Sequence, residues 1–227
     1  VISGFVTETG SGAPLSAIVT ANGSPSLKVI TQTTNPATGY YSMTLVGGGQ
    51  TWSVSASAAG HAGATQNLGA IAANQTVNLQ LQVFSTFICG GAFAAGNPTF
   101  NRTLTGNPPT SLSGSGTAVY YRPITFSVGT SGVYSIAMSS GLDGFYMLYQ
   151  TSFNPALPLA NALQAVDDVN GLNPAIFRSL TAGTPYVLIA TTFSNGTTGP
   201  FTDTITGFGV INAGCFMRRV WVPDVRR

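Results

Sequence analysis

The chain has 227 residues, of which 44% are hydrophobic and only 6% are charged, and its formal net charge is +2. Because ordinary soluble domains carry roughly 25% charged residues, this surface must be covered mainly by Ser, Thr, Asn, Gln and Gly, or by another protein. The length allows one large or two ordinary domains with a real hydrophobic core. Half of the eight basic residues lie in the last ten positions, without a basic face elsewhere, so we expect no nucleic-acid partner.

No run of about 18 uncharged apolar residues is present, so we expect no membrane span. The start at Val1 rather than Met is consistent with removal of a secretion signal. The two cysteines, Cys89 and Cys215, are expected to form a disulfide in an oxidising compartment, the alternative being two buried free thiols. These features favour an extracellular or cell-surface location.

Residues 1–82 contain short runs in which hydrophobic and polar residues alternate, which is the periodicity of a β-strand. Turn signals rich in Gly, Pro, Asn and Ser separate the runs, and no helical periodicity is present. About seven short strands in about 80 residues predict a small antiparallel β-sandwich. The predicted strands are Ile2–Thr7, Leu15–Ala21, Leu27–Thr33, Tyr40–Leu45, Thr51–Ser57, Thr65–Leu68 and Thr76–Val83.

This first half resembles the carboxypeptidase regulatory-like domain over residues 1–82. The segments that carry the resemblance are Ile2–Thr7, Gly12–Val19, Gly39–Met43, Trp52–Gly60 and Val77–Leu81. The resemblance implies a transthyretin-like β-sandwich that serves as a non-catalytic accessory, spacer or adhesive unit. The family usually has an aromatic residue after the late Gly, where this chain has His61.

Candidate chemistry in this half depends on His61, the only histidine of the chain. A serine triad would need it, but no strand–turn–helix elbow presents a Ser, so we expect a loop histidine with local hydrogen bonds. A second alternative is a covalent Lys–Asn crosslink from Lys28, with Glu8 beside it and Asn78 as its partner, although the spacing differs from that of the pilin domains that form one. We therefore predict no enzyme.

Residues 83–217 contain a turn-rich stretch, 90–116, followed by longer strands. Gly132–Met138 and Asp143–Tyr149 are predicted to be two strands joined by a short turn. The second is almost wholly apolar, so it should lie deep inside a sandwich. The other strands are Ala118–Val128, Ala175–Leu180, Tyr186–Thr192 and Phe201–Ile205. We predict an all-β chain with two antiparallel β-sandwiches in tandem, the first Ig/transthyretin-like (1–82) and the second jelly-roll-like (83–217), followed by a basic tail (218–227).

The second half resembles the bacterial pre-peptidase C-terminal (PPC-like) domain over residues 89–210. This resemblance implies an extracellular, non-catalytic β-sandwich that assists secretion, binding or assembly. The segments that carry it are Thr99–Arg102, Gly132–Tyr134, Asp143–Tyr149, Phe153–Asn161, Val166–Asp168, Leu180–Leu188 and Gly199–Gly207.

Three acids of this half are candidate metal ligands: Asp143, Asp167 and Asp168. Adjacent Asp residues on a loop, with a third carboxylate and backbone carbonyls, supply the oxygen ligands that Ca²⁺ requires. Asp side chains also cap turns by accepting hydrogen bonds from their own backbone. The pattern therefore fits either a calcium ion, the one cofactor that we consider, or turn capping.

The aromatic residues of the second half fit either a sugar-stacking platform or a hydrophobic core, and strand spacing favours the core. They are Tyr120, Tyr121, Tyr134, Phe145, Tyr146, Tyr149 and Phe153. Sequons at Asn22, Asn74, Asn101 and Asn195 would be glycan sites only in a host with that machinery.

The tail contains Arg218, Arg219, Val220, Trp221 and Val222, a β-prone run between basic residues that we expect to dock on a sheet edge of its own or a neighbouring subunit. The sequence therefore predicts a structural or adhesive protein whose partners are copies of itself, in a surface filament or sheath. The alternative is an accessory module that binds carbohydrates or another surface, with surface glycans as partners.

Overall fold

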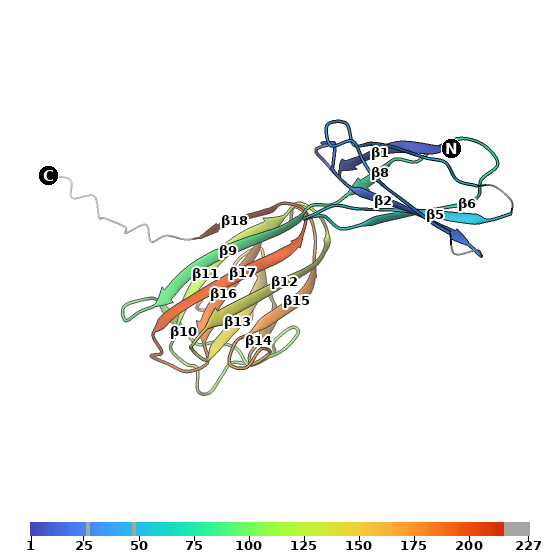
Figure 1. Cartoon of the computed structure of the whole chain (residues 1–227). Helices are drawn as coiled ribbons and strands as arrows, with labels where there is room; N and C mark the ends of the chain where they lie inside the picture. Colours follow the sequence, from blue (N-terminus) through green and yellow to red (C-terminus); the bar gives the residue numbers. More distant parts are fainter. Residues whose placement is uncertain (26–27, 47–48, 216–227) are drawn as a thin grey trace. The chain divides into compact units, whose positions relative to one another are not determined.

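The computed structural model describes residues 1–25, 28–46 and 49–215, and this part of the chain is all-β without a helix (Figure 1). The all-β prediction is confirmed, and these residues accordingly contain no helix that could cross a membrane. The chain divides into two compact units, Val1–Phe84 and Ser85–Arg227, with the boundary two residues after the expected one. The predicted docking residues, Arg218–Val222, lie outside the described residues.

Unit 1 consists of two four-stranded sheets. One has the order β3-β2-β5-β6, and in the other β1 lies between β4 and β7 and also pairs with β8. Because β1 pairs in parallel with β7 and β8, the prediction of a wholly antiparallel unit is wrong for this sheet. The strands are β1 (Ile2–Glu8), β2 (Ile18–Ser24), β3 (Lys28–Thr33), β4 (Tyr40–Met43), β5 (Thr51–Ser57), β6 (Ala64–Ala70), β7 (Gln75–Thr76) and β8 (Leu79–Leu81).

The parallel pairing has a simple topological cause. Strands next to each other in sequence return through tight turns and pair antiparallel, whereas a parallel pair needs a long connection. Between β4, which pairs antiparallel with β1, and β7, the chain passes through β5 and β6 of the other sheet, and this long connection lets β7 lie parallel to β1. A similar tertiary effect extends β2 through Asn22, which was expected in a turn but pairs with Val29 on one side and Ser53 on the other.

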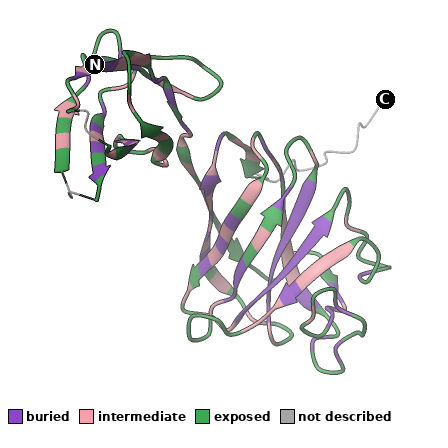
Figure 2. Ribbon diagram, turned by 90° about the vertical axis from the view of Figure 1, so that its right-hand side faces the viewer, coloured by how far each residue is buried: buried purple, intermediate pink, exposed green. Residues whose placement is uncertain are grey.

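One apolar core joins the two sheets of unit 1. Alternate residues of β1, β2, β4, β5 and β8 are buried, as the sequence periodicity predicts (Figure 2). The Tyr41 hydroxyl donates to the carbonyl of Val77 (2.7 Å), and burial raises the pKa of Tyr41 to about 12. The largest side chains in this core include Ile2, Tyr41, Met43, Trp52, Val54 and Leu81.

Unit 2 also consists of two sheets: a four-stranded sheet, β15-β12-β17-β9, and a six-stranded sheet, β10-β11-β16-β13-β14, in which β18 also pairs with β11. The sequence missed β10, β14 and β18. The strands are β9 (Phe84–Phe93), β10 (Thr99–Phe100), β11 (Val119–Val128), β12 (Gly132–Ser140), β13 (Gly144–Gln150), β14 (Ala162–Val166), β15 (Ala175–Leu180), β16 (Tyr186–Thr192), β17 (Gly199–Phe208) and β18 (Ile211–Cys215).

The two strands of the stretch 132–150 belong to different sheets. β12 pairs with β15 and β17, whereas β13 pairs with β14 and β16, so the turn between them crosses from one sheet to the other. β13 is buried at every position but its last, which confirms the prediction from its apolar sequence. Tyr146 and Leu148 point into a core that both sheets share.

The opposite face of β13 is also covered. Phe145, Met147 and Tyr149 form a second core with residues of β16, and rings from the loop segments close it. The Phe153 ring lies 4.9 Å from Tyr149 and 5.3 Å from Phe100. The six-stranded sheet therefore has its central strands buried on both faces, which explains why β13 and β16 read as continuous apolar runs.

The ties between the sheets of unit 2 include a disulfide and hydrogen bonds. The predicted disulfide between Cys89 of β9 and Cys215 of β18 is confirmed, with 5.7 Å between the Cα atoms. On the opposite edges, Arg178 of β15 donates to the carbonyl of Leu163 in β14 (3.3 Å). Inside the core, Tyr146 donates to the fully buried carboxylate of Asp203 (2.6 Å), and burial raises the pKa of Asp203 to about 7 although Tyr146 and Arg122 act against this.

We predict that replacing both cysteines, Cys89→Ser with Cys215→Ser, destabilises unit 2 and leaves unit 1 unchanged. The bridge closes a loop with a sequence separation of 126 residues, for which chain entropy assigns roughly 4–5 kcal/mol. Hydrogen exchange followed by mass spectrometry in denaturant resolves the two units. Equal protection of unit 2 in the variant and the native chain would contradict this prediction.

Candidate functional site

The three predicted metal ligands lie together at one end of unit 2. Each of Asp143, Asp167 and Asp168 offers one carboxylate oxygen, and these oxygens lie within 4.8 Å of one another. Two oxygens bound to one Ca²⁺ are at most about 5 Å apart, because each Ca–O distance is about 2.3–2.6 Å. One ion can therefore be reached by all three residues.

The strand register brings these residues together. β13 and β14 run antiparallel with Tyr146 opposite Val166, so the start of β13 lies beside the end of β14. Asp143 directly precedes β13, and Asp167 directly follows β14. The backbone N–H of Phe193 donates to the carbonyl of Asp143 (3.0 Å) and fixes the turn.

Arg102 supplies the neighbouring positive charge. Its side chain is buried, 1% exposed, and its guanidinium lies between the rings of Phe145 and Phe193, 4.3 Å from each ring centre. It donates hydrogen bonds to the carbonyls of Phe193 (3.0 Å) and Thr103 (3.0 Å). The charge thus acts on the acids from a distance, because its donors are directed to carbonyl oxygens. Sequence reasoning assigned no role to this isolated Arg, and no local signal could have placed it here.

The charge balance of the cluster favours a cation. Burial first, then repulsion by Asp168 and Asp143, raise the pKa of Asp167 to about 6. Burial, followed by the charge of Asp168, also raises the pKa of Asp143, whereas Arg102 lowers it. When all groups are ionised, three carboxylates and one guanidinium leave a net charge of −2. A divalent cation would neutralise this charge.

The alternative of turn capping finds less support. The Oδ1 atoms of Asp143 and Asp167 are buried, and neither atom accepts a hydrogen bond from a residue that the structure describes. The Oδ1 atom of Asn173, on the loop that follows Asp168, is likewise buried without a hydrogen-bond partner in the part of the chain that the structure describes. A capping Asp would accept such a bond from a backbone N–H. The calcium site stays a prediction, with donors that fit it.

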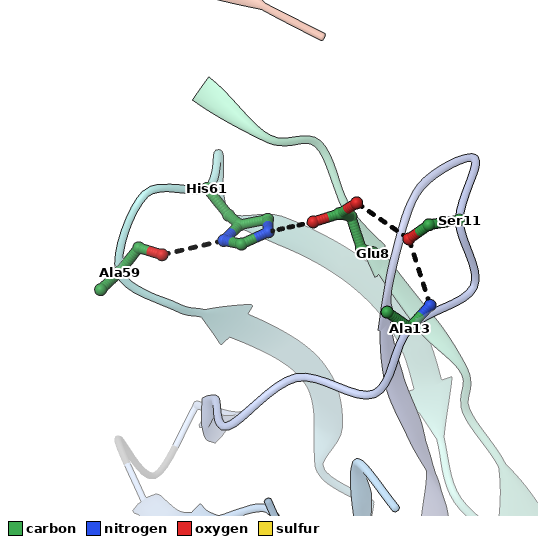
Figure 3. A network of polar contacts seen from close by, with 5 residues as sticks. All are labelled: Glu8, Ser11, Ala13, Ala59 and His61. Carbon is green, nitrogen blue, oxygen red and sulfur yellow. Dashed lines mark hydrogen bonds and ion pairs between the residues drawn. The ribbon is translucent and has the colours of Figure 1, made fainter. Parts of the chain in front are cut away.

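The only histidine lies in a separate polar group in unit 1 (Figure 3). His61 Nδ1 contacts the carbonyl of Ala59 (2.9 Å), and Nε2 contacts Glu8 Oε2 (3.1 Å). The Ser11 hydroxyl donates to Glu8 Oε1 (2.8 Å). The carboxylate therefore stands between the hydroxyl and the imidazole, whereas a catalytic triad requires the imidazole between them.

The residues considered for a covalent crosslink have other partners. The side-chain carbonyl of Asn78 accepts a hydrogen bond from the backbone of Phe5 (3.0 Å), and Glu8 is occupied by His61 and Ser11. Lys28 is an exposed residue of β3, in the other sheet. This geometry gives the crosslink no support.

Some of the predicted aromatic residues of unit 2 are fully buried in the core, and others are only partly buried at its edge. Tyr134, Phe145, Tyr146 and Tyr149 are at most 1% exposed, so these four cannot form a sugar-stacking platform. Tyr121 is only partly buried, at the rim of the second core.

No protein-family model matches this chain, and no curated protein matches it either. The two family resemblances therefore stay expectations. What bears on function is the geometry of the chain itself.

We predict that Ca²⁺ stabilises unit 2 through the acidic cluster. A cation that binds only the folded chain adds about 2.7 kcal/mol at a concentration about 100 times its Kd. Thermal unfolding with and without CaCl₂ measures this effect, which Asp167→Asn should abolish. Glu8→Gln, an acid removed from unit 1, is the matched control and should keep the full response.

Without the cation the effect of Asp167→Asn should reverse. Because the folded-state pKa of Asp167, about 6, exceeds the ordinary 3.8, folding favours the protonated acid, and this contribution to stability is lost as the pH rises from about 4 to 6. At neutral pH in a chelator, the Asn variant should melt higher than the native chain. A lower melting temperature in chelator, together with no response to Ca²⁺, would contradict the assignment.

Proposed function

We propose that this chain is an extracellular structural or adhesive subunit without catalytic activity, built from two β-sandwiches in tandem, which assembles with copies of itself into a surface filament or sheath. The observation that carries the proposal is the outward face of the four-stranded sheet in unit 2, which presents no charged side chain. Soluble monomers cover such faces with charge, which prevents association.

That face also presents large apolar side chains. Phe177 of β15 is 65% exposed and Val133 of β12 is 59% exposed. In the register Val133 lies opposite Ser179 and Ser135 lies opposite Phe177, so the two apolar residues are diagonal neighbours on one face. The outward residues of β12, β15 and β17, three neighbouring strands of this sheet, are Val133, Ser135, Ala137, Ser139, Phe177, Ser179, Thr202, Thr204, Thr206 and Phe208.

The sandwich arrangement is supported by the cores. In each unit, buried residues of two different sheets belong to one apolar cluster, which is what two sheets packed face to face produce. The extracellular location is supported by the disulfide, since such bonds persist in oxidising compartments. The resemblances to carboxypeptidase regulatory-like and PPC-like domains are consistent with both.

The absence of catalysis is supported by the surroundings of His61. Each of its ring nitrogens already contacts an oxygen, and Ser11 is directed to Glu8. A general base needs a ring nitrogen that can accept the proton of a nucleophile. Both ring nitrogens of His61 are already engaged with oxygen atoms.

The second candidate function, binding of neutral glycans, is favoured by one groove on unit 2. The groove is shallow and open to solvent, has a volume of about 510 Å³ beside β18, and is lined by uncharged residues that include Thr125, Ser127, Thr151 and Asn212. Gly214 also lines it, and an added side chain there would enter open space. Binding on a glycan array that Gly214→Trp abolishes would favour this function over self-assembly alone.

The proposed assembly is tested on the purified chain. Sedimentation velocity should show oligomers that grow with concentration, and Phe177→Asp should shift the chain to monomers because it replaces the most exposed apolar side chain of β15 on the neutral face by a charge. Leu157→Asp is the matched control, since Leu157 is 61% exposed on a loop outside this face, and it should assemble as the native chain does. A native chain that stays monomeric at high concentration would refute the proposal.

A further inference from the structure

Glu8 and His61 belong to the two elements that flank the last segment of unit 1, Leu81–Phe84, here called the exit segment (Figure 3). On one side β1 pairs with β8, so that Glu8 lies opposite Leu81. On the other side lies the loop that carries His61, which forms a β-bridge with Val83. The contact between the two side chains therefore joins both flanks of the exit segment.

The backbone of the loop holds the exit segment through hydrogen bonds on either side of His61. The Ala62 N–H donates to the carbonyl of Gln82 (2.8 Å), and the Phe84 N–H donates to the carbonyl of Gly60 (2.7 Å). Any change that moves the His61 loop away from β1 must therefore strain or release these two bonds.

The imidazole of His61 needs two protons in this arrangement. Nδ1 faces a backbone carbonyl, and Nε2 faces a carboxylate oxygen of Glu8. Both oxygens accept hydrogen bonds and cannot donate them, so both ring nitrogens must donate. A neutral imidazole carries a single N–H and would direct a lone pair at one of the two oxygens.

We propose that Glu8 and His61 form a pH-sensitive clasp that holds the exit segment while the imidazole is doubly protonated and loosens it when the second proton is lost. Imidazoles change charge in the range between about pH 5 and 8. The doubly protonated ring donates to both oxygens, whereas the neutral ring can donate to only one of them.

The groups around the clasp determine the lowest pH at which it can hold. The side chains of His61 and Glu8 are 12% and 28% exposed, so solvent screens the pair only in part. The hydrogen bond from His61 first, and that from Ser11 second, hold the pKa of Glu8 below its ordinary value, which keeps the carboxylate ionised in mild acid. The other formal charges in the described part of unit 1 are Lys28 of β3 and the amino terminus, which donates to Asn74, and neither contacts the pair.

The full chain offers a clean test because it contains one histidine. In ¹⁵N-histidine-labelled protein near pH 5.5, both ring nitrogens should show the shifts of protonated imidazole. Between about pH 6 and 8, the hydrogen-exchange protection factors of the Ala62 and Phe84 amides should fall about two- to fivefold, as expected for a partly exposed ion pair. The amide of Val54 in the sheet should keep its protection.

Glu8→Gln distinguishes a protonation clasp from a merely structural contact. A Gln amide can donate to the lone pair of neutral imidazole, so in this variant the protection of Ala62 and Phe84 should be retained or should rise with pH. Ser11→Ala leaves the ion pair in place and should keep the native pH dependence. Protection that does not vary with pH in the native chain, or the same variation in Glu8→Gln, would overturn the proposal.

Discussion

Burial of the six-stranded sheet on both faces is the constraint on which unit 2 depends. One face of β13 and β16 packs against the four-stranded sheet, so the other must be covered by something else. The chain supplies that cover from β10 and from the loop that follows β13, which place Phe100 and Phe153 over the strands. Arg102 enters the same layer and its charge is accommodated between aromatic rings and carbonyl oxygens. The acidic cluster follows from this arrangement. Asp143 and Asp167 lie at the ends of β13 and β14, next to the layer that contains Arg102.

Several of the charged residues that the structure describes tie elements to one another. Asp203 is fully buried under Tyr146, Arg178 joins β15 to β14, and Glu8 joins β1 to the His61 loop. A chain with eight basic and six acidic residues that directs several of them inward leaves its sheet faces covered by Ser, Thr and Ala. The neutral face of the four-stranded sheet follows from this distribution as much as from the low total charge.

Local patterns predicted the strands that alternate or that are apolar throughout. β15 and β16 begin and end where their sequences indicate, and β13 begins and ends one residue later, because burial on one or both faces leaves a direct mark on the sequence. β14 and β18 were missed, since Ala162–Val166 and Ile211–Cys215 are short segments without a clear local pattern, and β18 forms only against β11, a partner distant in sequence. The parallel pairing of β1 depends likewise on contacts that no local pattern contains. Asp143 and Asp167 could be suggested by composition, but their neighbour Arg102 comes from a segment that only the tertiary fold brings there.

Both units respond to acidity in the same direction, for different reasons. In unit 2, burial raises the pKa values of Asp167 and Asp203, so the folded chain gains stability when these acids are protonated. In unit 1, the proposed clasp acts in the same direction, because only the doubly protonated ring donates to both of its oxygen partners. A divalent cation would relieve the repulsion at Asp167 but would leave Asp203 and His61 unaffected, since these are not among the clustered ligands. The acid response of the chain should therefore have a component that calcium removes, confined to the acidic cluster, and a component that calcium cannot remove.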